Sequence, residues 1–312
     1  MSTIETARST VASPAPPKSA LRQDRYAPYF FISPFYILFT VFFLFPTIFA
    51  LVLGFLKWNS LATPEFFGLK NYQHLFNDPV FWQSVSNTIF YALASLGIVV
   101  PLALLEALAL NSKMLKFRTL WRVVYFAPIV TSTVAIALVF RTLYNRDFGA
   151  INQLIQALGG LPVDWLGNVQ TARIAVMGVV IWRWTGLLAV YFLAGLQSIP
   201  EELHEAAAID GANTIQRFFG VTLPLLKPVI LFVCVIVLIG SMQIFDDPQL
   251  MTAGGQIGGP ANATMSIVEY LYLQGITNLL FGFASAVGTF LFVVIFVLSL
   301  LQFRVFRGFG TD

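Results

Sequence analysis

The sequence predicts an all-α integral membrane protein with six transmembrane helices and one cytoplasmic helix–turn–helix loop. Of the 312 residues, 57% are hydrophobic and 11% are charged, whereas a soluble domain carries about a quarter charged residues. The mean hydropathy is +0.78. The apolar residues gather in long runs, and a run of about 20 is enough for a helix to cross the hydrocarbon core. Such long unbroken runs favour helices over a β-barrel.

The chain begins with a polar segment. Residues 1–28 are rich in Ser, Thr, Ala and Pro, so we expect a disordered cytoplasmic tail. No apolar stretch with a cleavage site follows Met1 closely, and the first long apolar run begins at Tyr29, which excludes a signal peptide. We predict that residues 29–312 form one transmembrane domain.

Six apolar runs are long enough to be spans. Prolines inside them are tolerated in a membrane because neighbouring helices satisfy the freed carbonyl groups. We expect Pro34 and Pro46 to kink the first span, and Pro128 lies within the third. The predicted spans are residues 29–56, 85–110, 120–144, 174–196, 225–245 and 281–303, and the polar loop 198–224 lies between the fourth and the fifth.

Basic residues give the orientation, because cytoplasmic loops carry an excess of Lys and Arg. With the N-terminus inside, the inner segments hold Arg8, Lys18, Arg22, Arg25, Lys113, Lys116, Arg118, Arg122, Arg217, Lys227, Arg304 and Arg307. The outer segments hold Lys57, Lys70, Arg141, Arg146 and Arg173. Both termini and the loop 198–224 are therefore predicted to be cytoplasmic.

This loop carries helix start and stop signals. Ser198 is suited to cap a first helix and Pro200 to occupy its first turn. Gly211 can adopt a left-handed conformation and end that helix. Asn213 can cap a second short helix, which we expect Pro224 to break. The pattern predicts two short helices joined by a glycine turn.

A motif in the loop resembles that of one family. Glu205-Ala206-Ala207, then Asp210-Gly211-Ala212, then Leu223-Pro224 resembles the coupling loop of permease subunits of binding-protein-dependent ABC importers. The likeness extends from about Pro34 to Phe303 and is strongest to the carbohydrate type, in the maltose and glycerol-3-phosphate branch. The chain lacks the Gly-Ala-Val-Lys-Gly-like tail of the second-type subunit and so resembles the first type.

The resemblance implies a multi-pass protein of the bacterial inner membrane that forms half of a pathway for a sugar or sugar-like solute. It implies a heterodimer with a second permease, two ATPase subunits that bind ATP and Mg²⁺, an extracytoplasmic solute-binding protein, and no nucleic acid. It assigns ATPase coupling to the motif residues, which are Glu205, Ala206, Ala207, Asp210, Gly211, Ala212, Leu223 and Pro224.

The residues themselves argue against catalysis. No Gly-x4-Gly-Lys phosphate-binding motif occurs, so the chain is predicted not to hydrolyse ATP and to be no enzyme. Two histidines and one cysteine, Cys234, form no metal-ligand pattern, so we expect no metal and no cofactor in this chain.

Arg183 is the first candidate for solute contact. It lies near the middle of the fourth span between Trp182 and Trp184, where a charge costs about 2.5–3.5 kcal/mol on insertion scales. Such residues usually face a bundle interior or a water-filled path. The alternative is a structural role, in which Arg183 pairs with Glu106 or supports packing and the tryptophans face lipid or the core.

The resemblance adds further positions. In maltose-type permeases, residues at fixed distances from landmarks near the ends of the fourth and fifth spans contact the sugar. The corresponding positions here are Arg183, Trp184, Leu187, Gly240, Ser241 and Ile244, with Gln243 beside them. Asp246 and Asp247 follow the fifth predicted span, and we expect them to face water rather than the solute.

Two other functions are less well supported. An ion-gradient-driven secondary transporter would need intramembrane carboxylates and repeated broken helices, and among the carboxylates only Glu106 lies within a predicted span. A membrane enzyme would need a catalytic cluster near the interface, and the sequence contains none.

Overall fold

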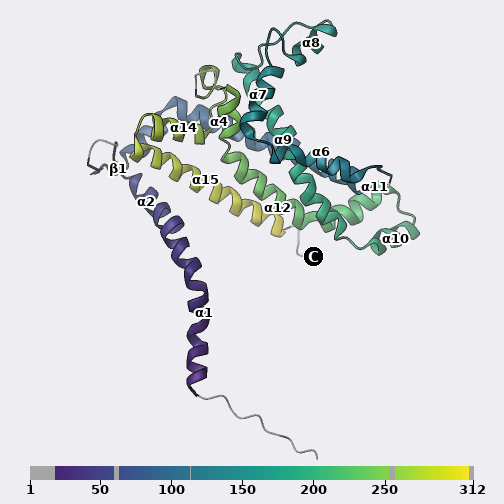
Figure 1. Cartoon of the computed structure of the whole chain (residues 1–312), viewed down its shortest axis with the longest axis horizontal. Coiled ribbons are helices and arrows are strands. Elements are labelled where there is room, and N and C mark those ends of the chain that lie inside the picture. The colour runs from purple at the N-terminus through teal and green to yellow at the C-terminus, as the bar shows by residue number, and fades with distance from the viewer. Residues whose placement is uncertain (1–17, 60–62, 113, 253–256, 309–312) are drawn as a thin grey trace, which may run out of the picture. The chain divides into compact units, whose positions relative to one another are not determined.

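Helices account for nearly all regular structure in the part of the chain that the structure, a computed structural model, describes. The described residues are 18–59, 63–112, 114–252 and 257–308. The chain divides into two units, which meet between Ala50 and Leu51 in the sequence. Figure 1 labels the elements of both units.

The first unit contains most of the first span, which ends at Leu53, just past the boundary in the sequence. Helix α1 covers Lys18–Phe39, a π-helical segment η1 covers Thr40–Leu44, and α2 covers Phe45–Leu53. Residues 1–17 of the predicted tail lie outside the described residues, and helix α1 begins before the expected start of the span. The large apolar side chains from Tyr26 onward are exposed. Such an apolar surface all round a helix is typical of contact with lipid.

The second unit holds the remaining elements. A two-stranded antiparallel sheet pairs β1 (Leu56–Lys57) with β2 (Glu65–Phe66). The long helices are α4 (Pro79–Ala94), α5 (Val100–Asn111), α6 (Arg118–Val130), α7 (Thr133–Leu143), α9 (Val169–Gln197), α12 (Leu223–Met242) and α15 (Phe281–Gly308). The shorter helices are α3 (Lys70–Asn77), α8 (Ala150–Ala157), α10 (Glu201–Ile209), α11 (Thr214–Arg217), α13 (Asp246–Thr252) and α14 (Ile267–Tyr272).

Helix α9 lies at the centre of the second unit. It packs against α5, α6 and α12, while α12 also packs against α4 and α15 (Figure 1). The contact between α9 and α6 depends on Gly186, because a Cβ built there would lie 1.9 Å from the backbone oxygen of Tyr125. Small residues allow such close helix approach in membrane proteins.

Five of the six predicted spans coincide with helices that are long and apolar enough to cross a membrane. The helical spans among the described residues are Tyr26–Leu53, Pro79–Asn111, Val169–Gln197, Thr214–Met242 and Phe281–Val305. The fifth prediction differs most, because its helix begins at Thr214 rather than at 225.

The predicted third span, 120–144, is not one straight helix. Helices α6 and α7 are bent by 98° where they meet, so the described residues contain five continuous spans, or six if this broken pair counts as one. The backbone at Thr131 and Ser132 is extended, and the Thr131 hydroxyl donates to the Ala127 carbonyl at 2.8 Å. Pro128 cannot donate to the preceding turn, and a threonine hydroxyl that bonds to the backbone competes with helical bonds.

Three of the π-helical segments stand directly before a proline. Segments η1, η2 (Ser95–Val99) and η3 (Phe218–Thr222) each end two residues before a proline, at Pro46, Pro101 and Pro224. The backbone N–H of the residue before each proline donates to the carbonyl oxygen five residues earlier, whereas an α-helix uses the carbonyl four residues earlier. A wider π turn absorbs the steric conflict that a proline ring creates in an α-helix. These helices therefore continue through their prolines.

The third of these segments, η3, corrects one prediction within the loop. Pro224 does not break the second short helix, because α11, η3 and α12 run on as one helix from Thr214 to Met242. The predicted turn at Gly211 and the predicted cap at Asn213 are present, as described below.

Buried polar side chains join α4 to the segment before α14. The Asn87 amide donates to the carbonyl of Met265 at 3.0 Å, and the Thr88 hydroxyl accepts from the backbone of Ile267 at 2.9 Å. The Ser266 hydroxyl and the Glu269 carboxylate form a capping box at the start of α14. These bonds hold the segment between α12 and α15 against α4.

Candidate functional site

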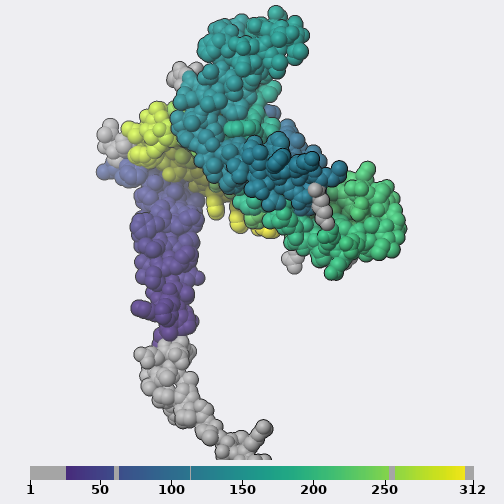
Figure 2. Space-filling model, turned by 45° about the vertical axis from the view of Figure 1, so that its right-hand side comes forward, coloured from purple at the N-terminus to yellow at the C-terminus, as the bar shows by residue number. Residues whose placement is uncertain are grey.

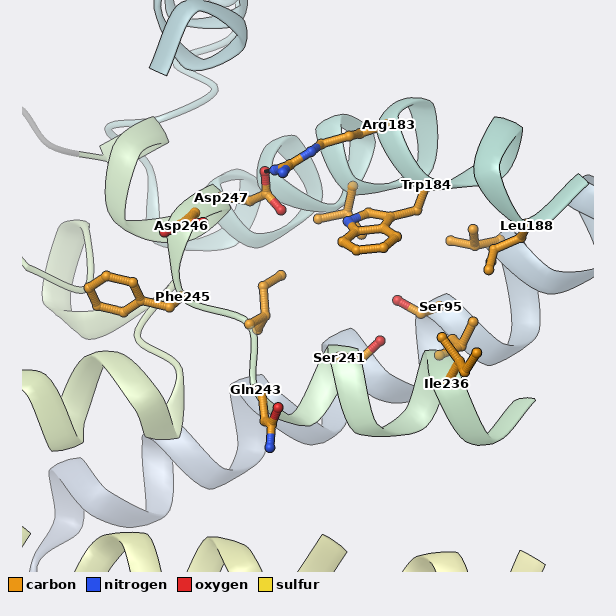
Figure 3. A pocket seen from close by; sticks show the side chains of 15 residues that line it. Ser95, Arg183, Trp184, Leu188, Ile236, Ser241, Gln243, Phe245, Asp246 and Asp247 are labelled. Carbon is orange, nitrogen blue, oxygen red and sulfur yellow. Dashed lines mark hydrogen bonds and ion pairs between the residues drawn. The ribbon is translucent and has the colours of Figure 1, made fainter. Parts of the chain in front are cut away.

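A cavity of about 260 Å³ lies among the central helices. Its walls come from η2, the middle of α9, the end of α12 and the segment that leads into α13. The residues that line it are Ser95, Val99, Val180, Arg183, Trp184, Leu188, Ile236, Val237, Gly240, Ser241, Gln243, Ile244, Phe245, Asp246 and Asp247. Figure 3 shows Arg183 and Trp184 on α9, with Ser95 and Ser241 across the cavity from them.

Arg183 forms an ion pair across this cavity. Its Nη1 donates to Oδ1 of Asp247 at 2.8 Å, and the two side chains are 13% and 7% exposed. Figure 3 shows the two groups pointing toward each other from α9 and the start of α13. Burial raises the pKa of the Asp247 carboxyl, while the adjacent guanidinium favours the carboxylate and acts in the opposite direction.

This pair rules out one alternative and corrects one expectation. Arg183 pairs with Asp247 and not with Glu106, and Asp247 is buried rather than facing water. Asp246 is exposed, as expected. An unpaired buried charge is costly, so a mid-span arginine is expected to have a carboxylate partner. The sequence contains several carboxylates and does not show which of them pairs with Arg183.

Most of the predicted pathway positions meet in the cavity. Arg183, Trp184, Gly240, Ser241, Gln243 and Ile244 line it, but Leu187 does not, and its neighbour Leu188 takes that place. Sequence reasoning missed Ser95, whose buried hydroxyl has no hydrogen-bond partner in the part of the chain that the structure describes. The sequence feature that could have pointed to it is a serine in an apolar span, six residues before Pro101. In the structure Ser95 begins a π-helical segment, which widens the helix there.

The two tryptophans that flank Arg183 have different environments. Trp184 lines the cavity, and the guanidinium carbon of Arg183 lies 5.7 Å from its ring centroid. Trp182 is exposed and packs against Phe140, with ring centroids 5.2 Å apart. Only Trp184 can therefore offer its ring to a molecule in the cavity.

Glu106 lies elsewhere. It lines a second cavity of about 440 Å³ with Trp121, Tyr125 and Thr185, on the side of the unit where α5 meets α6. Both of its carboxylate oxygens are buried without a hydrogen-bond partner among the described residues. It therefore has no contact with Arg183 or with the first cavity.

The loop 198–224 forms the predicted helix–turn–helix. Gly211 has a φ of +85°, its N–H donates to the carbonyl of Ala208 at 3.1 Å, and that of Ala212 donates to Ala207 at 2.9 Å. This pair of bonds is the Schellman arrangement that ends helices at a left-handed glycine. Asn213 then caps α11, with Oδ1 accepting from the backbone of Gln216 at 2.9 Å.

The start of the first loop helix differs from the prediction. Helix α10 begins at Glu201 with Pro200 before it and no side-chain cap. Ser198 instead ends α9, where its hydroxyl donates to the carbonyl of Gly195 at 2.7 Å. Glu201 and Glu202 lie in the first turn of α10, where the helix dipole favours negative charge, and so support its start.

The loop presents an uncovered surface. Glu205, Ala206, Asp210 and Gly211 are exposed, and large apolar side chains are exposed beside them. Those side chains are Leu203, Ile209, Ile215 and Phe219, of which Ile209 is 86% exposed. Figure 2 shows this green segment as a lobe at one end of the second unit. A cluster of exposed apolar side chains with a polar margin is typical of a protein-binding surface.

A further buried carboxyl lies in the first turn of α14. Glu269 is fully buried in its capping box, with Oε2 accepting from the backbone of Ser266 at 2.8 Å and no partner for Oε1. Burial raises the pKa of Glu269 to about 8, against the opposing effect of the hydrogen bond from the backbone of Ser266.

Comparison with known sequences finds one family. Residues 100–309 match the model of the binding-protein-dependent transport system inner membrane component. The arabinooligosaccharides transport system permease protein AraP of Bacillus subtilis is 38% identical over 288 residues, which cover 91% of this chain and 90% of that protein. The lactose transport system permease protein LacF of Rhizobium radiobacter is 36% identical, over 89% of this chain and 93% of that protein.

Comparison with solved structures finds the same architecture. A bacterial ABC transporter involved in the import of the acidic polysaccharide alginate contains a chain that superimposes with a TM-score of 0.80 and 24% identity. The match covers 94% of this chain and 99% of that one.

Proposed function

This chain belongs to the family of binding-protein-dependent transport system inner membrane components, and from that membership we propose that it forms half of the pathway of an ABC importer for a sugar or sugar-like solute. Its relatives named above are permeases for arabinooligosaccharides and for lactose, which supports a carbohydrate. As the first-type subunit, it pairs with a different second permease in the inner membrane, with both termini in the cytoplasm.

One observation carries this proposal. The two helices that form the main walls of the first cavity, α9 and α12, lead at their other ends into the exposed helix–turn–helix of the loop. At 1.5 Å per residue, Gly240 in the wall lies about 25 Å along the helix from Leu223 at its start. A movement of the loop is therefore passed through continuous helices to the cavity.

The importer needs further subunits, because the sequence of this chain contains no phosphate-binding motif for ATP. Two separate ATPase subunits bind ATP and Mg²⁺ and dock on the loop, where Glu205 offers an acceptor and Ala206 and Ala207 permit close approach. The motif residues Asp210, Gly211, Ala212, Leu223 and Pro224 set the direction of the two helices. An extracytoplasmic binding protein delivers the solute to the cavity, where Arg183, Trp184, Ser241 and Gln243 contact it.

Reconstitution of the importer tests this function. The tagged chain is co-expressed with the second permease, the ATPases and the binding protein, and uptake of labelled oligosaccharides into vesicles is measured with and without ATP. We expect ATP-dependent uptake of a sugar by the complete complex and none by this chain alone. ATP-dependent uptake by the chain without the other subunits would refute the proposal.

A matched pair of variants tests the docking surface. Glu205→Ala should weaken co-purification of the ATPases, while Glu202→Ala, which removes another exposed carboxylate of α10, should leave it unchanged. Equal behaviour of the two variants would remove Glu205 from the docking surface.

A further inference from the structure

The charges around the first cavity are almost balanced within this chain. Among the described residues that line it, Arg183 is the only cation, and Asp246 and Asp247 are the anions. The Arg183 guanidinium forms an ion pair with Asp247 at 2.8 Å, so its positive charge is neutralised at the cavity wall. Asp246 is exposed at the margin. The wall therefore carries no free positive charge.

From this geometry we infer that the cavity selects neutral sugars against acidic ones, with Asp247 as the residue that sets this selectivity. The inference rests on the proposed function and adds the charge class of its solute. Arg183 by itself would favour a carboxylate or sulfonate group, because its planar fork of donors binds such anions in pairs of hydrogen bonds. Asp247 occupies that fork.

An acidic sugar would have to displace this partner. If Arg183 turned toward the solute, the Asp247 carboxylate would remain buried without a counter-ion, which is costly in an apolar interior. If Arg183 stayed with Asp247, the acidic group of the solute would be desolvated beside two carboxylates of the same charge. Repulsive elements of this kind are how binding sites reject wrong partners.

A neutral sugar meets neither penalty. Among the described residues, Nε of Arg183 and the hydroxyl of Ser95 are buried without a hydrogen-bond partner, so a sugar hydroxyl group that reaches either atom would satisfy it. Ser241 and Gln243 add groups that both donate and accept. Figure 3 shows the ring of Trp184 at the wall opposite Ser241, where it can face the apolar side of a sugar ring.

The first experiment identifies the charge class of the solute. The binding protein is screened by thermal shift against neutral probes (arabinotriose, lactose and maltotriose) and an acidic probe, trigalacturonate. Each probe that binds is then tested for uptake by the reconstituted importer. We expect binding and uptake of a neutral probe, with uptake of trigalacturonate at least tenfold lower. Equal or faster uptake of trigalacturonate would overturn the inference and leave the proposed function intact. Failure of every sugar would overturn both.

The second experiment tests the role of Asp247. Uptake of the neutral probe is normalised to the amount of assembled complex and to its basal ATPase activity. We expect Asp247→Asn to reduce uptake about tenfold, because Arg183 becomes an uncompensated cation. The double variant Arg183→Gln with Asp247→Asn should return uptake to within about threefold of the wild type. Asp147→Asn, at an exposed site away from the cavity, is the matched control and should behave as the wild type.

Two results would refute charge compensation. Wild-type uptake by Asp247→Asn would show that the carboxylate has no role. A double variant no better than the single one would show that the solute needs the guanidinium itself rather than a neutral wall.

Discussion

Replacement of Gly211 by alanine isolates the contribution of one backbone conformation to ATPase docking. Gly211 has a φ of +85°, and among the described residues beyond its two chain neighbours no atom lies within 4 Å of the position that a Cβ would take. A side chain there therefore meets no steric obstacle from neighbouring groups. Its cost is the strain of a left-handed backbone, about 1–2 kcal/mol for an L-residue.

The same loop supplies a control. Gly220 also has open space around its Cβ position, but it lies in the helical segment η3 with an ordinary negative φ. Alanine at Gly220 should stabilise the helix by about 0.5–1 kcal/mol, because glycine has more conformational freedom to lose in a helix. The two substitutions add the same methyl group to the same exposed loop and have opposite expected signs.

The strain at Gly211 has a predictable effect on docking. A free energy of 1–2 kcal/mol changes the ratio of two states by about 5–30-fold. If the ATPases bind the loop only in its native turn, the dissociation constant should rise by about that factor in Gly211→Ala and remain unchanged in Gly220→Ala. The measurement is titration of purified ATPase onto the detergent-solubilised permease pair. Wild-type affinity in Gly211→Ala, with normal assembly, would show that the turn is not needed for docking.

Three further predictions concern the interior. Arg183→Leu should destabilise the assembled complex by about 3–5 kcal/mol, because it leaves the buried Asp247 carboxylate without its counter-ion. Thermal unfolding should show that adding Asp247→Leu restores stability and that adding Glu106→Gln does not. Glu269 binds its proton more tightly in the folded state, so its contribution to stability is complete below its unfolded pKa and is lost as the pH rises toward about 8. The free energy of unfolding of the wild type should therefore fall by about 1.4 kcal/mol per pH unit between those two pKa values. In Glu269→Gln this pH dependence should be absent, and thermal unfolding at a series of pH values checks both variants. Gly186→Ala should prevent the close approach of α9 and α6 and abolish a folded complex by size-exclusion chromatography, since the added carbon would lie 1.9 Å from a backbone oxygen of α6.

The sequence by itself was sufficient for the membrane-spanning architecture and for the loop. Apolar runs of sufficient length have few alternatives to a spanning helix, because every backbone polar group must be satisfied inside the segment. The turn at Gly211 and the cap at Asn213 were predictable for a related reason, since both depend on neighbours within a few residues. Local chemistry decides such features, and the sequence displays it directly.

Other local features were predicted wrongly because two local rules compete. A proline within a span is expected to break its helix, yet at Pro224 a π turn absorbs the ring and the helix continues. At the 120–144 span the opposite holds, and the chain turns by 98° just after Pro128. Packing against neighbouring helices decides which outcome is lower in free energy, and no pattern within one span records that packing.

Only the tertiary structure decided the partner of Arg183. Glu106 and Asp247 were both available in the sequence, and the mid-span position of Glu106 made it the more obvious choice. Folding brings the start of α13 back over α9, which places Asp247 2.8 Å from the guanidinium and leaves Glu106 on another face. A charge in a membrane must find a counter-charge, so the sequence determines that Arg183 needs one. Which carboxylate provides it depends on how helices distant in the chain pack together.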